Sequence, residues 1–183
     1  MSVDVNRCKM MRTVECEQER HGEQILAILN DAILNSTALY DYKPRNPNMM
    51  IEWFNAKPKG NFPVIGIENE SGDLMGFGSY GTFRTWPACK YSVEHSVYVD
   101  ARFRGQGLGK RLLQELVATA QEQNYQILVA GIDAANSGSI HLHEGLGFAH
   151  CGTIRQAGFK FGRWLDLSFY ELLLPTPIDP TDG

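Results

Sequence analysis

The sequence has few of the residues that mark a disulfide-bonded, metal-binding or membrane protein. Its 183 residues include four cysteines, which are Cys8, Cys16, Cys89 and Cys151. No two of them form a CxxC pair, and their spacing matches no zinc pattern, so we expect reduced thiols and no bound metal. No apolar run is long enough to cross a bilayer, and the N-terminal sequence MSVDVNRCKM lacks the apolar core of a signal peptide. We therefore expect a cytoplasmic protein with no membrane partner.

An excess of basic residues is also missing. Lysine and arginine together number 17 against 21 aspartates and glutamates, which gives a formal net charge of -4. A general nucleic-acid binder is usually basic, so we expect no nucleic-acid partner. The length and the hydrophobic content of 43% suit one globular domain with a sizeable core. Residues 1–10 and 175–183 lack periodicity and are polar or proline-rich, so we expect loose ends around a single domain over 11–174.

Apolar spacing predicts a chain of helices and strands. Helical spacing predicts helices over 21–35, 47–54, 108–120 and 136–146. Alternating or continuous apolar segments predict strands over 11–16, 38–42, 62–68, 74–83, 91–99, 127–132, 148–155 and 161–173, with a turn around Gly158 between the last two. Gly76, Gly78 and Gly81 mark a bend of their strand or the close approach of a ligand. The pattern predicts one α/β domain with a mostly antiparallel sheet.

The stretch from Tyr91 to Leu116 has the pattern of a strand, a glycine-rich turn and an amphipathic helix. The turn, from Arg104 to Lys110, has the sequence RGQGLGK. The backbone N–H groups of such a turn bind an anion such as a pyrophosphate, and glycine allows the close approach. The alternatives are a turn that needs glycine for geometry only and a nucleotide-binding fold. The pattern GxxxxGK[ST] is absent, and a dinucleotide fold expects its glycine turn after the first strand rather than in mid-chain.

The turn also fills the pattern R/Q-x-x-G-x-G/A, through Arg104, Gly107 and Gly109. In this motif the chain resembles the GCN5-related N-acetyltransferases (GNAT), in which the turn binds acyl-CoA. The segments NSTALYDY, FPVIGIE, GFGSYGTFR, YSVEHSVYV, NSGSIHLHEGLGF and GFKFGRWLDLSFYEL are similar to the branch that contains phosphinothricin, methionine sulfoximine and methionine sulfone acetyltransferases. The likeness covers 11–174. It implies a single GNAT domain, a mixed and mostly antiparallel central sheet of about seven strands flanked by about four helices.

The resemblance implies transfer of an acetyl group from acetyl-CoA, the cosubstrate, to the α-amino group of a small amino-acid-like molecule. Phosphinothricin, methionine sulfoximine and methionine sulfone are the expected acceptors, which makes a detoxifying role plausible because the first two mimic an intermediate of glutamine synthetase. A peptide N-terminus or a polyamine as the acceptor stays open, as does a non-catalytic acyl-CoA sensor. The branch also implies a homodimer.

Two residues are candidates for proton transfer. An ammonium cannot attack a thioester, so a carboxylate must take its proton, directly or through a water. The family places its base in the motif that here contains Glu94; the alternative is a solvent-facing glutamate on an edge strand. Alternation puts Glu94, Ser96 and Tyr98 on one face of the strand and the valines on the other. His143 stands where many members have a tyrosine that serves the leaving thiolate, and it acts either as that proton donor or only in packing.

The acetyl-CoA contacts that the resemblance implies lie in three segments. The strand contributes mainly main-chain groups, and one N–H there can donate to the thioester oxygen. The start of the last helix is capped by its asparagine, which can also bond the pantetheine amide. The implied residues are Val97, Tyr98 and Val99 of the strand, Arg104, Gly105, Gln106, Gly107, Leu108, Gly109 and Lys110 of the turn, and Asn136 and Ser139 of the helix.

The carboxylate of an amino-acid acceptor calls for an arginine, and the branch holds its acceptor with the loop that precedes the catalytic strand. The implied acceptor contacts are Arg84, Thr85 and Trp86 in that loop, with Glu94, His95 and Ser96 beside them on the strand. The alternatives are a surface charge for the arginine and a packing aromatic for the tryptophan. The aromatic residues expected to wall the pocket or simply to pack are Tyr40, Phe83 and Trp164. The loop sequence WPACKY departs from the branch, which leaves the exact acceptor open.

Overall fold

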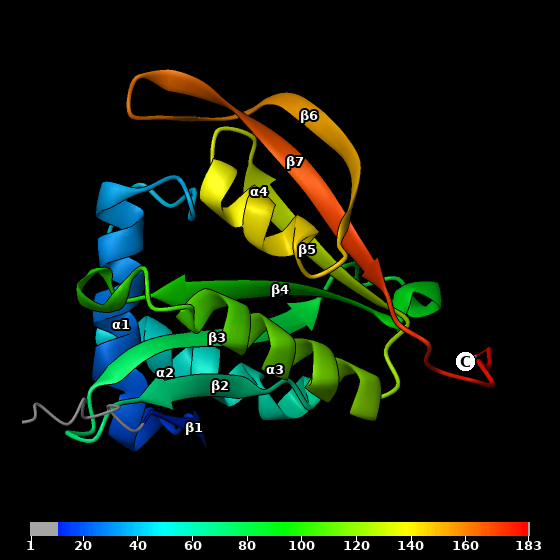
Figure 1. Ribbon diagram of the computed structural model, residues 1–183, viewed down its shortest axis with the longest axis horizontal. Helices are drawn as coiled ribbons and strands as arrows, with labels where there is room; N and C mark the ends of the chain where they lie inside the picture. The colour runs from blue at the N-terminus through cyan, green and yellow to red at the C-terminus, as the bar shows by residue number, and fades with distance from the viewer. Residues whose placement is uncertain (1–10, 183) are drawn as a thin grey trace, which may run out of the picture.

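The computed structural model describes residues 11–182. Seven strands form one sheet in the order β1-β2-β3-β4-β5-β7-β6 (Figure 1). The strands are β1 (Arg12–Glu15), β2 (Val64–Glu68), β3 (Leu74–Thr82), β4 (Ser92–Val99), β5 (Ile127–Asp133), β6 (Ala149–Lys160) and β7 (Arg163–Leu173). The α-helices of the described range are α1 (Gln18–Asn35), α2 (Pro47–Ala56), α3 (Leu108–Glu122) and α4 (Ser137–Glu144). The expected mixed, mostly antiparallel fold of seven strands and four helices is confirmed.

The sheet parts between its two parallel strands. All other neighbours are antiparallel, whereas β4 and β5 run parallel and pair only over three positions, the last of them Glu94 opposite Val129. Beyond that point β4 stays paired with β3 up to Val99, and β5 stays paired with β7 up to Asp133. Each strand therefore keeps one partner while a wedge opens between them, which Figure 1 shows above β4.

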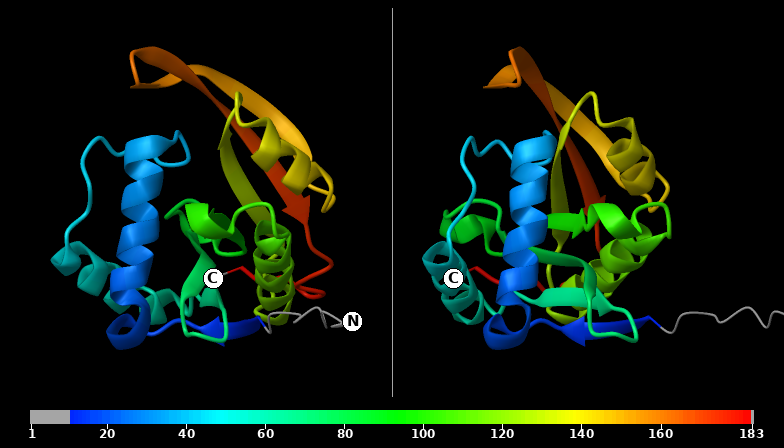
Figure 2. Two further views of the ribbon diagram at one scale, coloured as in Figure 1. Left: turned by 60° about the vertical axis from the view of Figure 1, so that its left-hand side comes forward. Right: turned by 90° about the vertical axis from the view of Figure 1, so that its left-hand side faces the viewer.

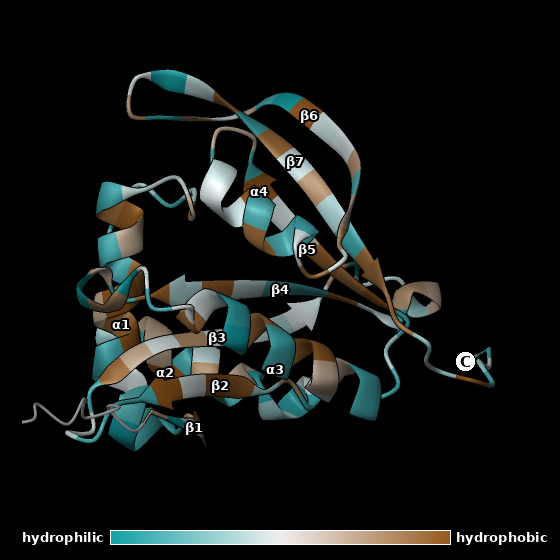
Figure 3. Cartoon of the chain, in the orientation of Figure 1, coloured by the Kyte–Doolittle hydropathy of each residue, from teal (hydrophilic) through white to brown (hydrophobic). Residues whose placement is uncertain are grey.

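The helices cover opposite faces of the sheet. Figure 2 shows α1 and α2 on one side and α3 and α4 on the other. Helix α3 buries Leu112, Leu113 and Leu116 completely, and burial of a leucine side chain stabilises the fold by about 2 kcal/mol. Brown and teal residues alternate along α3 in Figure 3, as expected for a helix with one buried face.

Gly76 and Gly78 of β3 allow a helix, rather than a ligand, to pack closely on the strand. A Cβ on Gly78 would lie 2.8 Å from a methyl group of Leu116, and one on Gly76 would lie 3.3 Å from a methyl group of Leu112. Both leucines belong to α3. Close packing of this helix on the sheet, together with the Tyr98 carbonyl 2.8 Å from a Cβ on Gly76, is therefore the reason for the two glycines, whereas nothing lies within 4 Å of a Cβ on Gly81.

The strand predicted over 38–42 is wrong. Residues 36–46 have no helix or strand, and this connection runs beside the tip of the β6–β7 hairpin. The Lys160 ammonium donates to the carbonyls of Ile33, Ser36 and Leu39 at 2.7, 2.9 and 2.6 Å. Because two of these carbonyls belong to the connection, its polar backbone is satisfied by a side chain instead of a neighbouring strand.

The turn predicted around Gly158 lies further along the chain. Strand β6 continues through Lys160, and the hairpin turns at Phe161 and Gly162, whose φ angles are 52° and 73°. Two successive positive φ angles are the signature of a type I′ turn, which suits the twist of a hairpin. Gly158 instead makes room for a neighbour, because a Cβ there would lie 2.8 Å from the ring of Tyr40.

The C-terminal segment and the cysteines of the described range add little to the architecture. Residues 175–182 form no helix or strand, and the Thr176 hydroxyl donates to the Tyr125 carbonyl at 2.6 Å. The expected loose N-terminus at 1–10, with its cysteine, lies outside the described residues. Cys16, Cys89 and Cys151 are free thiols. No helix in the described range is long and apolar enough to span a membrane.

Candidate active site

A cavity of about 1020 Å³ occupies the wedge between β4 and β5. Its walls are β4 from Glu94 to Val99, β5 from Ala130 to Asp133, the start of α4, the glycine turn, the end of α1 with residues 36–40, and part of the β6–β7 hairpin. The turn and the hairpin lie at different parts of this wall. The cavity is thus large enough and varied enough in its lining to hold two reactants.

Glu94 lies where the two strands begin to part. Its side chain is half-buried, and a Cβ on Gly131 of β5 would lie 3.2 Å from its Oε1 atom. Burial raises the pKa of Glu94 above its ordinary value, while the positive charge of Arg84 opposes the rise. A carboxylate with a raised pKa is a stronger base than one in free solution.

The predicted alternation along β4 is found in the structure. Val93 is buried in the core that α3 covers, whereas Tyr98 stacks on Phe77, with ring centroids 5.5 Å apart, in the core that α1 covers. Glu94 and Ser96 share the face of Tyr98. The Tyr98 side chain therefore packs in the core.

The hydrogen bonds of β4 show which of its main-chain groups face the wedge. The Asp100 N–H, directly after the strand, donates to the Met75 carbonyl at 3.0 Å. In an antiparallel pair the hydrogen-bonded positions alternate, so the even-numbered residues of β4 bond to β3. The N–H groups of Val97 and Val99 and the Val97 C=O therefore point into the cavity, where an extended molecule can pair with them, while the Val99 C=O accepts from Arg104 Nε at 3.4 Å.

The glycine turn has the geometry of an anion site. Gly105 and Gly107 have φ angles of 76° and 75°, and no atom lies within 4 Å of the position of a Cβ on either. These glycines thus serve the backbone conformation rather than packing. Gly107 is the N-cap of α3, so the first N–H groups of the helix have no acceptor within it. Arg104 adds a positive charge at the cavity wall, whereas Gln106 and Lys110 do not line the cavity.

Two buried histidines meet at the cavity wall. His143 Nδ1 lies 2.7 Å from the Ser139 carbonyl, so this nitrogen carries the proton and donates it. The Nε2 atom of neutral His143 then accepts from His95 Nε2, 3.0 Å away. Burial first, and His143 second, lower the pKa of His95 to about 3, and burial lowers the pKa of His143. Both rings are therefore neutral at pH 7, and the one N–H of His143 is already engaged.

The sequence placed His95 beside Glu94, but the structure puts it on the opposite face of β4, against α4. Alternation contained the signal for this position, because residue 95 shares its face with Val93 and Val97. The pairing with His143 had no signal, because 48 residues separate the two rings. Asn136 caps α4 as expected, since its Oδ1 accepts from the Ser139 N–H at 3.1 Å.

The predicted acceptor loop lies outside the cavity. Arg84, Thr85 and Trp86 are exposed, and none of them lines the cavity. The Arg84 guanidinium donates to the adjacent Phe83 carbonyl at 3.2 Å, and its charge reaches Glu94. Of the three aromatic residues expected to wall the pocket, Tyr40 lines it, whereas Phe83 and Trp164 do not.

Sequence reasoning did not single out an ion pair at the cavity wall. Arg163, at the start of β7, lines the cavity and donates from Nη2 to Oδ2 of Asp133 at 3.1 Å. Burial raises the pKa of Asp133, but hydrogen bonds from Thr37, the Ala135 amide and Arg163 together hold it below its ordinary value. Among the described residues, no group of three or more histidine, cysteine, aspartate and glutamate side chains is arranged to hold a metal ion.

The geometry defines a class of protein. Main-chain groups exposed by parting strands suit the amide-containing arm of a thioester cofactor, and the adjacent turn suits its pyrophosphate, so the site is that of an acyl-CoA-dependent acyltransferase. The chain belongs to the acetyltransferase (GNAT) family, whose family model matches residues 27–148. It is accordingly an N-acetyltransferase that uses acetyl-CoA.

Known acetyltransferases are similar to this chain over most of its length. The chain is 43% identical to the L-methionine sulfoximine/L-methionine sulfone acetyltransferase of Pseudomonas paraeruginosa, over 86% of this chain and 89% of the relative. It is 55% identical to a candidate acetyltransferase of Acinetobacter baylyi ADP1, with a TM-score of 0.95 over 97% of this chain and 99% of that structure. A GNAT phosphinothricin acetyltransferase of Sinorhizobium meliloti, solved in complex with acetyl-CoA, is 31% identical with a TM-score of 0.88 over 94% of both chains.

Proposed function

We propose that this enzyme acetylates the α-amino group of a small amino acid whose side chain carries an oxidised sulfur or phosphorus. Methionine sulfoximine, methionine sulfone and phosphinothricin are the proposed acceptors. One observation carries the proposal: the half-buried Glu94 carboxylate lies in the cavity, at the point where β4 and β5 part. The names of the similar proteins from Pseudomonas paraeruginosa and Sinorhizobium meliloti support the class of acceptor.

In the proposed mechanism the residues of β4 act on both reactants. Glu94 takes the proton that the attacking amine loses, and its raised pKa favours that transfer. The Val97 N–H, which points into the wedge, donates to the thioester oxygen and favours the negative charge that develops there. The glycine turn and Arg104 hold the pyrophosphate. The acetyl group then passes directly from the thioester to the amine as the C–S bond breaks, and CoA leaves as a thiolate that takes up a proton from water.

The hydrogen bonds of His143 favour packing over proton donation. Its N–H is committed to the Ser139 carbonyl, and its other nitrogen accepts from His95. Donation to a thiolate would have to break the first bond or start from a protonated ring, and burial disfavours the protonated ring. We therefore assign His143 to the cavity wall.

A homodimer and a cytoplasmic location belong to the same proposal. Trp86 and Trp164 are 69% and 58% exposed, and large exposed aromatic side chains are enriched at protein interfaces. Light scattering of the purified protein is expected to give twice the mass of one chain. A monomer at micromolar concentration would remove the homodimer from the proposal.

The test is a panel of amines with acetyl-CoA, read by release of free CoA and by the mass of the product. We expect fast turnover with methionine sulfone, methionine sulfoximine or phosphinothricin, and an added acetyl group on the α-nitrogen. A peptide with a free N-terminus and a polyamine serve as competing acceptors. Faster turnover of either one would replace the proposed acceptor, and tight acetyl-CoA binding without transfer to any amine would replace the proposed activity.

A further inference from the structure

The cavity contains an arginine that is held in place for binding. Arg163 and Arg104 are the arginines in the cavity lining of the described residues, and Arg104 belongs to the glycine turn. The Arg163 side chain is 49% exposed, whereas the Asp133 side chain that it contacts is 2% exposed. Asp133 also accepts from the Ala135 N–H at 3.0 Å, which fixes the carboxylate. A guanidinium has five N–H donors, and the bond from Arg163 Nη2 to Asp133 uses one of them.

A second donor lines the same cavity as this arginine. The Tyr40 hydroxyl is buried and has no hydrogen-bond partner among the described residues. Its ring packs over Gly158, and the charges of Asp133 and Arg163 both act on it. A buried hydroxyl is normally paired, and leaving one unpaired costs about 1–3 kcal/mol.

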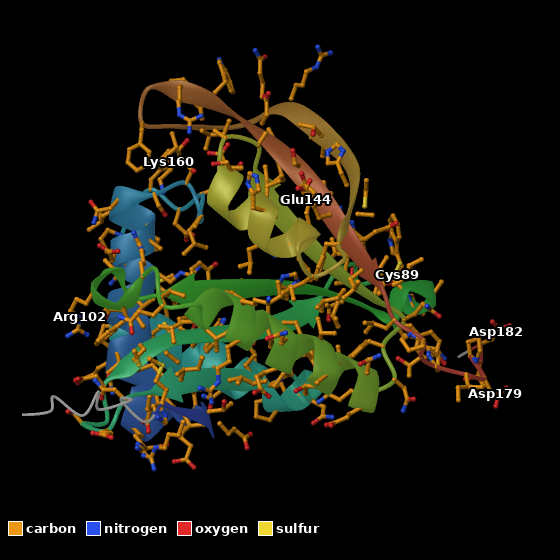
Figure 4. The ribbon with its side chains drawn as sticks, viewed as in Figure 1. Cys89, Arg102, Glu144, Lys160, Asp179 and Asp182 are labelled. Carbon is orange, nitrogen blue, oxygen red and sulfur yellow. The ribbon has the colours of Figure 1, made fainter. Side chains whose placement is uncertain are left out.

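The connection that carries Tyr40 is fixed to the hairpin that carries Arg163. Lys160, 5% exposed, binds three carbonyls at the end of α1 and in the connection. The Tyr42 hydroxyl donates to the Phe159 carbonyl at 2.7 Å. Figure 4 shows Lys160 between the tip of the hairpin and the end of α1. The two donors therefore have a fixed relative position before any ligand arrives.

The distance along β5 matches the length of a short side chain. Gly131 lies beside the Glu94 carboxylate, and Asp133, the partner of Arg163, lies two residues further along the same strand. Two residues of a strand span about 7 Å. An acceptor whose amine meets Glu94 thus needs a side chain of two or three bonds to bring a polar terminal group toward Arg163.

We propose that Arg163 and the Tyr40 hydroxyl form a subsite for the S–O or P–O oxygens of the acceptor side chain. The subsite rests on the proposed function and adds a reason for its substrate class. A site that donates hydrogen bonds to these oxygens rejects an analogue that lacks them, because the donors of the protein are then left unpaired. Methionine and methionine sulfone differ only in these oxygens, so their comparison isolates the subsite.

The experiment measures kcat/KM for methionine sulfone and for methionine in the wild type and in variants. We expect the wild type to prefer the sulfone. Arg163→Met is expected to lower this preference at least about tenfold, as a charged hydrogen bond is lost, and Tyr40→Phe to lower it about two- to tenfold. The losses are expected in KM for the sulfone, while KM for acetyl-CoA stays within about twofold.

Matched variants separate the subsite from folding effects. Arg155→Met changes an exposed arginine of the same hairpin, and Tyr91→Phe removes a hydroxyl that bonds the Thr181 carbonyl, outside the cavity lining. Both are expected to keep the preference. Because Arg163→Met removes the positive charge beside the buried Asp133, a second variant, Arg163→Lys, keeps a charge there and is expected to keep the fold while losing the preference in part.

Each outcome decides a separate point. If the wild type acetylates the sulfone but Arg163→Met and Tyr40→Phe keep the wild-type preference, or if the wild type does not prefer the sulfone, the subsite is refuted and the proposed function stands. Equal loss on both substrates would show a structural role and would also refute the subsite. If the wild type acetylates neither amino acid nor any other acceptor of the panel, the proposed function fails and the subsite fails with it.

Discussion

At the scale of single residues, the chemistry depends on Glu94. Its pKa lies above 4.5 because of burial, and a base acts in its deprotonated form. In the wild type we therefore expect kcat to fall as the pH drops through this raised pKa. Glu94→Gln is expected to lower kcat/KM for the amine by about 10²- to 10³-fold at pH 7. The pH–rate profile of both proteins, measured by CoA release, checks the prediction.

The loss of kcat/KM in Glu94→Gln, relative to the wild type, is expected to depend on pH. Near and above the pKa of a free α-amine, about 8, part of the substrate has already lost its proton, so the variant recovers toward the wild type. Glu122→Gln, an exposed change at the end of α3, is the control and is expected to behave as the wild type. A profile of Glu94→Gln that parallels the wild type at all pH values would remove Glu94 as the base.

Single positions differ in how far the sequence can predict them. The face of Glu94 follows from the period of a strand and needs nothing but its neighbours. Arg163 and Asp133 lie 30 residues apart in the chain and meet only because β5 pairs with β7. No local sequence pattern predicts this contact, so the sequence alone could not distinguish Arg163 from an arginine with a purely surface position.

At the scale of elements, the glycine turn gives a sharp prediction. Gly107 has a φ of 75° with open space around its Cβ position. Alanine fits there but strains the backbone by about 1–2 kcal/mol, so Gly107→Ala is expected to distort the turn and to raise KM for acetyl-CoA. Gly72→Ala is the matched control, because Gly72 has a φ of 81° and equally open surroundings in the β2–β3 turn. Its KM for acetyl-CoA is expected to be unchanged.

Thermal melts and steady-state kinetics on both glycine variants separate strain from binding. Both variants are expected to lose stability to a similar degree, since the backbone penalty is the same. An unchanged KM for acetyl-CoA in Gly107→Ala would mean that the turn does not bind the cofactor through its backbone.

The contact of Lys160 with the connection after α1 predicts a loss of stability. Lys160→Met removes the ammonium from three carbonyls, and buried acceptors without a partner are expected to cost about 2–4 kcal/mol in the free energy of unfolding. Denaturant titration of the variant measures the loss. Lys43→Met, an exposed lysine of the same connection, is expected to stay within about 0.5 kcal/mol of the wild type. Equal stability of the two variants would contradict the role of Lys160.

This contact also explains why the connection was mispredicted. The apolar and aromatic residues of 38–42 have the composition of a strand, but Lys160, more than 120 residues away, binds the carbonyl of Leu39 among them. The hairpin turn was misplaced for a related reason. Phe161 adopts a positive φ that phenylalanine seldom does, whereas Gly158, the expected turn residue, makes room for Tyr40. The helices α1 and α3 depend on their own periodicity, and they were predicted correctly.

At the scale of the whole molecule, the wedge between β4 and β5 produces the site, and the pattern of apolar residues did not predict it. Both strands are apolar enough to be buried, and their apolar periodicity gives no sign that the two strands separate. Their separation after Glu94 follows from the different partners that each retains, β3 and β7. The resemblance to a family supplied the main-chain role of the strand that borders this wedge, because a family motif carries tertiary information that local spacing lacks.

A buried carboxylate joins the edge of the sheet to α1 and sets the acid stability of the molecule. Glu68 of β2 is fully buried and accepts from Arg12 of β1 at 2.7 Å, from Arg20 at 2.8 Å and from His21 at 2.9 Å. Burial raises the pKa of Glu68, but the hydrogen bonds from His21 and Arg12 and the charges of Arg20 and Arg12 outweigh it and lower the pKa below 4.5. The pairing is therefore fully present above pH 4.5 and is lost as the pH falls through the lower folded-state pKa.

Glu68→Gln is expected to destabilise the protein by about 1–3 kcal/mol at pH 7, because it removes the buried counter-charge of Arg12 and Arg20, whose side chains are 61% and 49% exposed. Urea titrations at several pH values measure the difference from the wild type. The difference is expected to be constant above pH 4.5 and to shrink below it, since the wild type then loses the same charge by protonation. Glu52→Gln, an exposed glutamate of α2, is the control and is expected to cost less than about 0.5 kcal/mol at every pH. A difference for Glu68→Gln that does not change between pH 3 and pH 7 would show that the charge of Glu68 contributes nothing and that only its shape and hydrogen bonds hold β1, β2 and α1 together.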